Sequence, residues 1–129
     1  MSTAQTRRET TERMLPPDLV RAAQAAYGKK ASDVVVLNLK KVSSFTDYFL
    51  ICTGQNPRQV KAIAEAIETM VGAAGTRAAN VEGYDRSDWI LLDYFDFVVH
   101  VFTADQRQFY SLERLWGSAE RTTVPDASA

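Results

Sequence analysis

The chain has 129 residues, of which 46% are hydrophobic and 24% are charged, and its formal net charge is −1 at pH 7. This length suits one domain with a single core, and the composition is that of an ordinary globular protein, which argues against a disordered or fibrous chain. No apolar run approaches the length that spans a bilayer, so the sequence predicts no membrane segment.

The first half of the chain predicts one helix followed by two buried strands. Apolar residues recur at helical spacing over residues 19–27, where Asp18 or the residues before it can cap the helix and Gly28 can end it. Residues 33–39 and 48–53 are apolar and rich in β-branched or aromatic side chains, as in strands that are buried on both faces.

A long helix is expected next, because Asn56 is a good N-cap and Pro57 suits the first helical position. One apolar stripe follows at helical spacing. It consists of Val60, Ile63, Ala64, Ile67 and Val71.

The second half predicts a short strand within 77–83, two strands at 89–92 and 97–102, and a final helix over 106–115. Residues 94–96 would form the tight link between the two longer strands. The order of elements predicts a single α/β domain with a mixed β-sheet flanked by helices.

The two ends of the chain are expected to be disordered tails, at residues 1–16 and 118–129, on either side of one domain at 17–117. The N-terminal stretch lacks the hydrophobic run of a secretory signal. Glu9 and Glu12 argue against a transit peptide, because such peptides avoid acidic residues.

The sequence shows no catalytic or metal-binding set. His100, the only histidine, lies in an apolar strand without a second His or Cys nearby, which favours a buried, hydrogen-bonded structural role. Cys52, the only cysteine, excludes an internal disulfide and is expected to be a small buried residue in a reducing cytoplasm. Asp93 and Asp96 would need an anchored triphosphate to bind a catalytic Mg²⁺, and no suitable glycine-serine loop is present.

Charge is unevenly distributed along the chain. Residues 1–61 carry 10 basic and 5 acidic side chains, whereas residues 62–129 carry 5 basic and 11 acidic ones. An acidic face would attract basic proteins and repel phosphate backbones, and a plain solvated surface is the alternative. Trp89 and Tyr94 lie in this acidic half and suit either an interface or the core.

Strict alternation along the strand at 89–92 places Trp89, Leu91 and Asp93 on one face and their neighbours on the other. The sequence does not show which of the two faces is buried.

An ordered set of motifs resembles the Iojap-like family of bacterial ribosomal silencing factors over residues 30–117. The first block is Phe45-Thr46-Asp47-Tyr48-Phe49-Leu50-Ile51-Cys52-Thr53-Gly54 with Arg58-Gln59-Val60. The second block is Glu82-Gly83, Trp89-Ile90-Leu91-Leu92-Asp93-Tyr94, Asp96 and Val98-Val99-His100-Val101-Phe102. The closing helix matches at Arg107, Tyr110, Leu112-Glu113 and Leu115-Trp116.

The resemblance implies a nucleotidyltransferase-like fold without enzymatic activity or cofactor, and a cytoplasmic protein that is a homodimer when free. It also implies binding to the large ribosomal subunit through a ribosomal protein at the inter-subunit face, which sterically blocks subunit joining. Direct sequence-specific binding to nucleic acid is not expected. The implied contact residues are Trp89, Leu91, Leu92, Asp93, Tyr94 and Asp96.

The chain departs from the family pattern at three positions. Asn38 stands where Asp is usual, Asn56 where Ser is common, and Phe95 where Gly is common in the turn before Asp96. A bulky residue at position 95 is expected to alter the turn and to enlarge the apolar contact surface.

Two other functions remain open at this stage. One is a nucleotidyltransferase-like nucleotide-binding module, in which Asp93 and Asp96 would converge with a third carboxylate. The other is direct RNA binding through the basic half of the chain. The lysines concerned are Lys29, Lys30, Lys40 and Lys41.

Overall fold

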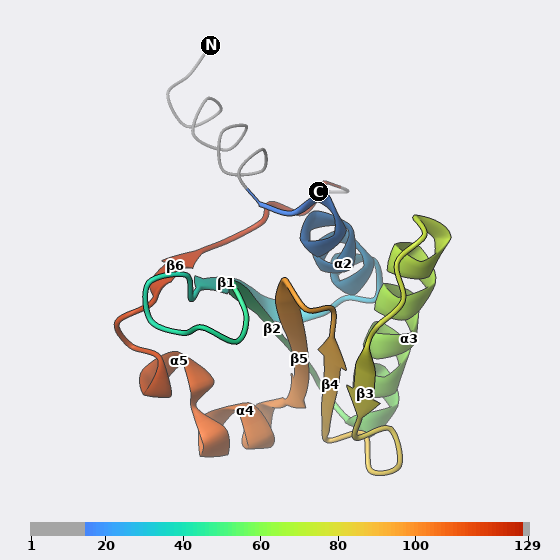
Figure 1. The fold of residues 1–129 in the computed structure, drawn as a ribbon. Helices are drawn as coiled ribbons and strands as arrows, with labels where there is room; N and C mark the ends of the chain where they lie inside the picture. The colour runs from blue at the N-terminus through green and yellow to red at the C-terminus, as the bar shows by residue number, and fades with distance from the viewer. Residues whose placement is uncertain (1–14, 128–129) are drawn as a thin grey trace.

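A computed structural model of the chain describes residues 15–127, which fold into one sheet packed between helices (Figure 1). In chain order the elements are α2 (Pro17–Gly28), β1 (Ser32–Asn38), β2 (Tyr48–Gly54), α3 (Pro57–Ala73), β3 (Asn80–Glu82), β4 (Trp89–Asp93), β5 (Phe97–Thr103), α4 (Ala104–Tyr110), α5 (Leu112–Leu115) and β6 (Glu120–Thr122). Among the described residues, no helix has the length and apolar character needed to cross a membrane.

The six strands are ordered β3-β4-β5-β2-β1-β6 across the sheet. Strands β2 and β5 run parallel, and every other neighbouring pair is antiparallel. The predicted mixed sheet of a single α/β domain is therefore confirmed. The parallel pair is possible because α3, β3 and β4 together form the long crossover between β2 and β5.

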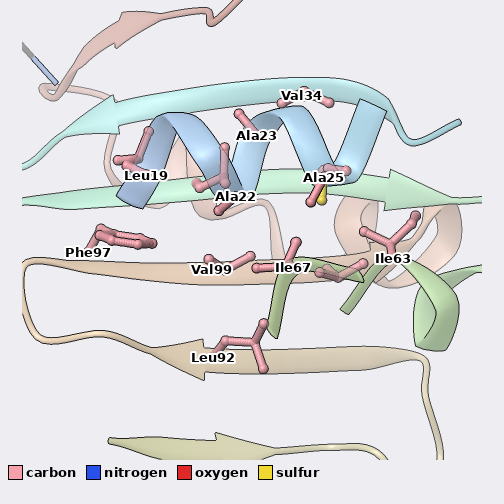
Figure 2. Close-up of a cluster of buried hydrophobic side chains, with 14 of the residues drawn as sticks. Leu19, Ala22, Ala23, Ala25, Val34, Ile63, Ile67, Leu92, Phe97 and Val99 are labelled. Atoms are coloured by element: carbon pink, nitrogen blue, oxygen red, sulfur yellow. The ribbon is translucent and has the colours of Figure 1, made fainter. Parts of the chain in front are cut away.

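One face of the sheet is covered by α2 and α3, which carry the larger part of the core (Figure 2). Helix α2 presents alanines and Leu19 to the strands, so it can approach the sheet closely. The predicted stripe of α3, from Val60 to Val71, is fully buried. Its N-terminus is capped as expected, since the Asn56 side chain accepts a hydrogen bond from the backbone N–H of Gln59 at 2.9 Å.

At the N-terminus of α2, the capping position falls on a residue before Asp18, which is one of the two possibilities that the sequence offered, but no side chain caps the helix. Pro16 occupies the capping position and makes no side-chain cap. Asp18 lies inside the first turn, where its carboxylate pairs with Arg21 at 2.7 Å and interacts favourably with the helix dipole. The predicted tail at 1–16 falls almost entirely outside the described residues.

The second face of the sheet, opposite α2 and α3, is only partly covered. A smaller cluster lies there, in which Leu112 and Trp116 pack over the β1–β2 end of the sheet. The Trp116 ring stands edge-on to Phe49, with 6.0 Å between ring centroids. The β3–β4 end of this face has no helix over it among the described elements (Figure 1).

The predicted single helix over 106–115 is in fact two short helices. Ser111 adopts a left-handed conformation, with φ of 46°, and separates α4 from α5. The break turns α5 back toward the sheet, which a continuous helix could not do. The sequence over residues 106–115 is compatible with one continuous helix, because no proline or glycine interrupts it.

The chain after residue 117 also differs from the predicted loose tail. Strand β6 pairs antiparallel with β1, and Val124 is completely buried against the larger core. The Tyr27 hydroxyl donates to the Val124 carbonyl at 2.7 Å, and the Gln24 amide donates to the Pro125 carbonyl at 2.8 Å. This segment was missed because three strand residues and one valine leave no periodic signal.

Deleting residues 118–129 is therefore expected to lower the free energy of unfolding by about 3 kcal/mol, through loss of the β6 pairing and of the buried Val124 side chain. Urea denaturation followed by circular dichroism measures the change. Deletion of residues 128–129 alone keeps every contact of the segment described above and is the matched control. Equal stability of the two truncated forms would show that β6 contributes nothing.

Candidate partner-binding surface

Strand β4 divides the predicted contact residues between its two faces. Trp89, Leu91 and Asp93 lie half-buried on the partly covered second face, with Leu91 opposite His100 on β5. Leu92 is fully buried under α3 on the first face. The structure thus answers the question that alternation alone left open, because α2 and α3 occupy only one side of the sheet.

Tyr94 belongs to the core rather than to the surface. Its side chain is 5% exposed and stacks on Phe97 with 5.0 Å between ring centroids. Burial, followed by the nearby Glu68 and Asp18 carboxylates, raises the pKa of Tyr94 to about 12. The assignment of Leu92 and Tyr94 as surface contacts is corrected accordingly: both are packing residues in this structure.

The turn after β4 exposes a large aromatic side chain. Phe95 is 74% exposed and has φ of 69°, in the left-handed region where glycine is unstrained. The Phe95 backbone N–H donates to Asp93 Oδ1 at 2.9 Å, and the Thr46 hydroxyl donates to the Phe95 carbonyl at 2.9 Å. These bonds hold a bulky residue in a conformation that suits glycine, and they place Asp96 beside it as an exposed carboxylate.

A pocket of about 330 Å³ opens on the second face beside this turn. Its lining is Phe45, Phe49, Asn80, Glu82, Leu91, Asp93, Val98 and His100. We call it the β4 pocket. Only Leu91 and Asp93 of this set were predicted as contact residues. Phe45, which is 63% exposed in the loop after β1, was not among the predicted contact residues, although a large apolar residue in a polar loop is a usable signal.

Gly83 allows the backbone after β3 to pass close to the backbone of β4. It has φ of 97°, and a Cβ atom there would lie 2.0 Å from the backbone oxygen of Trp89. No other residue is accommodated without moving the backbone. The Glu82-Gly83 motif of the sequence therefore has a structural reason, which is to bring β3 and β4 together at the pocket.

His100 lies at the base of the β4 pocket and is 4% exposed. The Trp89 indole N–H donates to His100 Nδ1 at 3.1 Å, and Phe49 stands edge-on to the imidazole at 4.5 Å. Nε2 is buried and has no hydrogen-bond partner among the described residues. The predicted buried, hydrogen-bonded histidine is confirmed for one nitrogen only. Burial lowers the pKa of His100 from 6.5 to about 4.

This shift predicts a pH dependence of stability. The pKa of His100 is lower in the folded chain than in the unfolded chain. The stability that depends on a neutral His100 is therefore fully present above pH 6.5, and it is lost as the pH falls from 6.5 toward 4. The expected loss is about 3 kcal/mol at 1.36 kcal/mol per pKa unit. Urea unfolding at a series of pH values measures it. His100→Gln removes the titrating group and should flatten the profile in this window, and an unchanged profile would contradict the assignment.

A second hollow lies at the other end of the sheet, where the carboxyl ends of β2 and β5 meet. Arg107 is buried at its centre and donates to the backbone oxygen of Asp33, to the Thr53 hydroxyl at 2.8 Å and to Glu113 at 2.9 Å. The hydrogen bond from Arg107 is the main cause that lowers the pKa of Glu113. The Thr53, Arg107 and Glu113 positions of the sequence motifs thus form one network that ties α4 and α5 to the sheet.

The nucleotide-binding alternative receives no support from this geometry. Asp93 pairs with Val98 near the start of β5, at the opposite end of the strand from the Arg107 hollow. Within residues 15–127, no three His, Cys, Asp or Glu side chains are grouped so that they could hold a metal ion.

The lysines of the RNA-binding alternative do not form one patch. Lys29 and Lys30 precede β1 and Lys40 and Lys41 follow it. The seven-residue strand between the two pairs is roughly 20 Å long at about 3.3 Å per residue.

Comparisons with known proteins agree with the sequence motifs. A family model described as "Ribosomal silencing factor during starvation" matches residues 13–129. The chain is 45% identical over 98 residues to the ribosomal silencing factor RsfS of Halalkalibacterium halodurans, covering 76% of this chain and 84% of that protein. It is 34% identical over 106 residues to the chloroplastic protein Iojap of Zea mays, covering 82% of this chain and 46% of that protein.

A solved structure shows the same fold. The X-ray crystal structure of a Chromobacterium violaceum protein superposes with a TM-score of 0.76 at 30% sequence identity, covering 88% of this chain and 96% of that one. The residues matched by the family model include the β4 strand and the lining of its pocket. The chain therefore belongs to the ribosomal silencing factor family, together with the Iojap-like proteins.

Proposed function

We propose that this chain represses translation by binding a ribosomal protein on the inter-subunit face of the large ribosomal subunit, where its bulk prevents the small subunit from docking. Two observations support this function: the family to which the chain belongs, and the β4 pocket with its surroundings. Relatives that carry the name ribosomal silencing factor supply the ribosomal target.

The β4 pocket supports a protein partner. Its rim combines an exposed aromatic, Phe45, with the carboxylates of Glu82 and Asp93, and the exposed Phe95 and Asp96 lie in the adjacent turn. Exposed aromatic side chains bury large areas at interfaces, and acidic side chains steer a basic partner. Proteins that bind ribosomal RNA carry such basic surfaces.

A subunit-joining assay tests the proposal. Purified large subunits are incubated with the chain, small subunits are added, and joined ribosomes are separated from free subunits on a sucrose gradient. The chain should cosediment with large subunits and reduce the joined fraction when it is added first. Unchanged joining at saturating occupancy would refute the steric mechanism, and absence of cosedimentation would refute ribosome binding itself.

The free chain is proposed to be a homodimer. Strands β3 and β6 are the two edges of the sheet described here, and an edge strand or an exposed apolar pocket can pair with a second copy. Light scattering at micromolar concentration measures the mass, and a strictly monomeric value would count against this part of the proposal.

A further inference from the structure

The hollow at the carboxyl ends of β2 and β5 lies where open α/β sheets bind their ligands. The chain leaves β2 toward α3 on the first face of the sheet, and it leaves β5 toward α4 and α5, of which α5 packs on the second face. Neighbouring parallel strands whose connections separate in this way leave a crevice beyond their ends. Here the crevice has a volume of about 330 Å³. We call it the Arg107 hollow, and it is lined by Asp33, Thr53, Ala104, Arg107, Gln108, Ser111, Glu113 and Arg114.

Arg107 uses only part of its hydrogen-bonding capacity within the protein. A guanidinium group has five N–H donors. Nε donates to Glu113, and Nη1 donates to the Asp33 backbone oxygen and to the Thr53 hydroxyl, so three donors are used. Nη2 makes no hydrogen bond to a described residue and is not among the atoms that are buried without a partner, so its two N–H groups remain open to solvent.

These free donors are held in place at the wall of the hollow. The Arg107 side chain is only 10% exposed, and Arg107 belongs to the lining of the hollow. Because the guanidinium is planar and is anchored through Nε and Nη1, the direction of the Nη2 donors is fixed. A ligand that binds them does not have to order a flexible side chain, which favours binding.

The charges around the hollow favour a negatively charged ligand. Glu113 is already compensated, because it pairs with Arg107 at 2.9 Å and with Arg121 at 3.2 Å. Arg114 is exposed in the lining and makes no ion pair with a described residue. Asp33 is an exposed carboxylate that opposes it. Two arginines with unused donors therefore face one uncompensated acid.

The backbone of the hollow is strained at two positions. Asp33 has φ of 50° and Ser111 has φ of 46°, in the left-handed region that residues other than glycine seldom adopt. Asp33 gives its backbone oxygen to Arg107, and the break at Ser111 lets α5 bring Arg114 to the hollow. Strain of this kind gathers at functional sites, which supports a binding role.

We propose that the Arg107 hollow binds a phosphate group, whose oxygens accept hydrogen bonds from Arg107 Nη2 and from the Arg114 guanidinium. Phosphate suits these donors because it offers several acceptor oxygens and the charge that arginine binds most strongly. The site requires neither a metal ion nor the Asp93 carboxylate, so it differs from the nucleotidyltransferase centre considered above. It goes beyond the proposed ribosome-binding function and does not depend on it.

Binding is tested first in the free, full-length chain. The ¹⁵N-labelled protein is titrated with sodium phosphate at constant ionic strength and followed by two-dimensional NMR. We expect saturable shifts of the backbone amides of Thr53, Arg107 and Ser111, with a Kd on the order of 1 mM. Sodium acetate should bind more weakly. Absence of saturable shifts would refute the site, and equal binding of acetate would refute the assignment to phosphate.

Two substitutions should change the affinity in opposite directions. Arg114→Gln removes a cation without a described ion pair and should weaken phosphate binding roughly two- to fivefold. Asp33→Asn removes the opposing carboxylate and should tighten binding roughly twofold, since asparagine tolerates the left-handed backbone. Arg77→Gln is the matched control, because it removes an exposed arginine just before β3, at the end of β4 away from the hollow. Equal weakening by Arg77→Gln and Arg114→Gln would show attraction by net charge alone and refute the site.

The source of the phosphate group is decided with purified large ribosomal subunits. If ribosomal RNA supplies it, Arg114→Gln and Asp33→Asn should shift the affinity for large subunits in the same two directions, and free phosphate should compete. If a free phosphate compound is the ligand, both variants should bind large subunits as the wild type does. A wild-type chain that binds phosphate but no large subunits would refute the proposed function and leave this inference standing.

Discussion

Tyr94→Ala is expected to lower the free energy of unfolding by about 3 kcal/mol or more, because it removes a buried aromatic ring from the larger core and leaves a cavity beside Phe97. The folded fraction should still bind large ribosomal subunits within a few-fold of the wild type, since only 5% of Tyr94 is exposed. Urea denaturation measures the first quantity and cosedimentation the second.

Tyr94→Phe is the matched control, because it keeps the ring and its stacking on Phe97 and removes only the hydroxyl. It should retain most of the stability that Tyr94→Ala loses. Phe95→Ala is the complementary variant, since it truncates the exposed neighbour and should weaken binding with little change in unfolding. The packing role of Tyr94 would be refuted by a stable Tyr94→Ala variant that no longer binds.

Leu91→Arg should reduce affinity for the large subunit by roughly a hundredfold or more, the size of effect seen at interface hot spots. Leu91 forms part of the wall of the β4 pocket between Glu82 on β3 and His100 on β5. An arginine there would fill the pocket and pair with its carboxylates, so it would remove both the cavity and the acidic character. The half-buried position allows the guanidinium to reach solvent, which should preserve the fold.

Met70→Arg is the control for this substitution. Met70 is 45% exposed on α3, the helix that covers the opposite face of the sheet, so the same charge is added away from the β4 pocket. Its affinity should stay within twofold of the wild type, and it should still prevent subunit joining. Equal loss in the two variants would mean that added positive charge, and not the pocket, is responsible.

The sequence by itself determined the elements whose signals are local and long. The cap at Asn56 and the five-residue stripe of α3 required that helix whatever packed against it, and the continuous apolar runs of β2 and β5 required strands in the middle of a sheet. The motif set around Trp89 and Gly54 is also sufficient to indicate the family, which the family model confirms. The break at Ser111 and strand β6 were missed because neither residue type nor periodicity marks them.

Only the tertiary structure decided which side chains of β4 are available to a partner. Alternation places Trp89, Leu91 and Asp93 on one face of β4, but it does not show whether that face is buried or open. That face is the more open one because α2 and α3 pack on the other side of the sheet. The buried, unpaired Nε2 atom of His100 is likewise absent from any local pattern. It arises because β4 and β5 pair in a register that brings the Trp89 indole to one imidazole nitrogen, while the other is buried without a hydrogen-bond partner among the described residues.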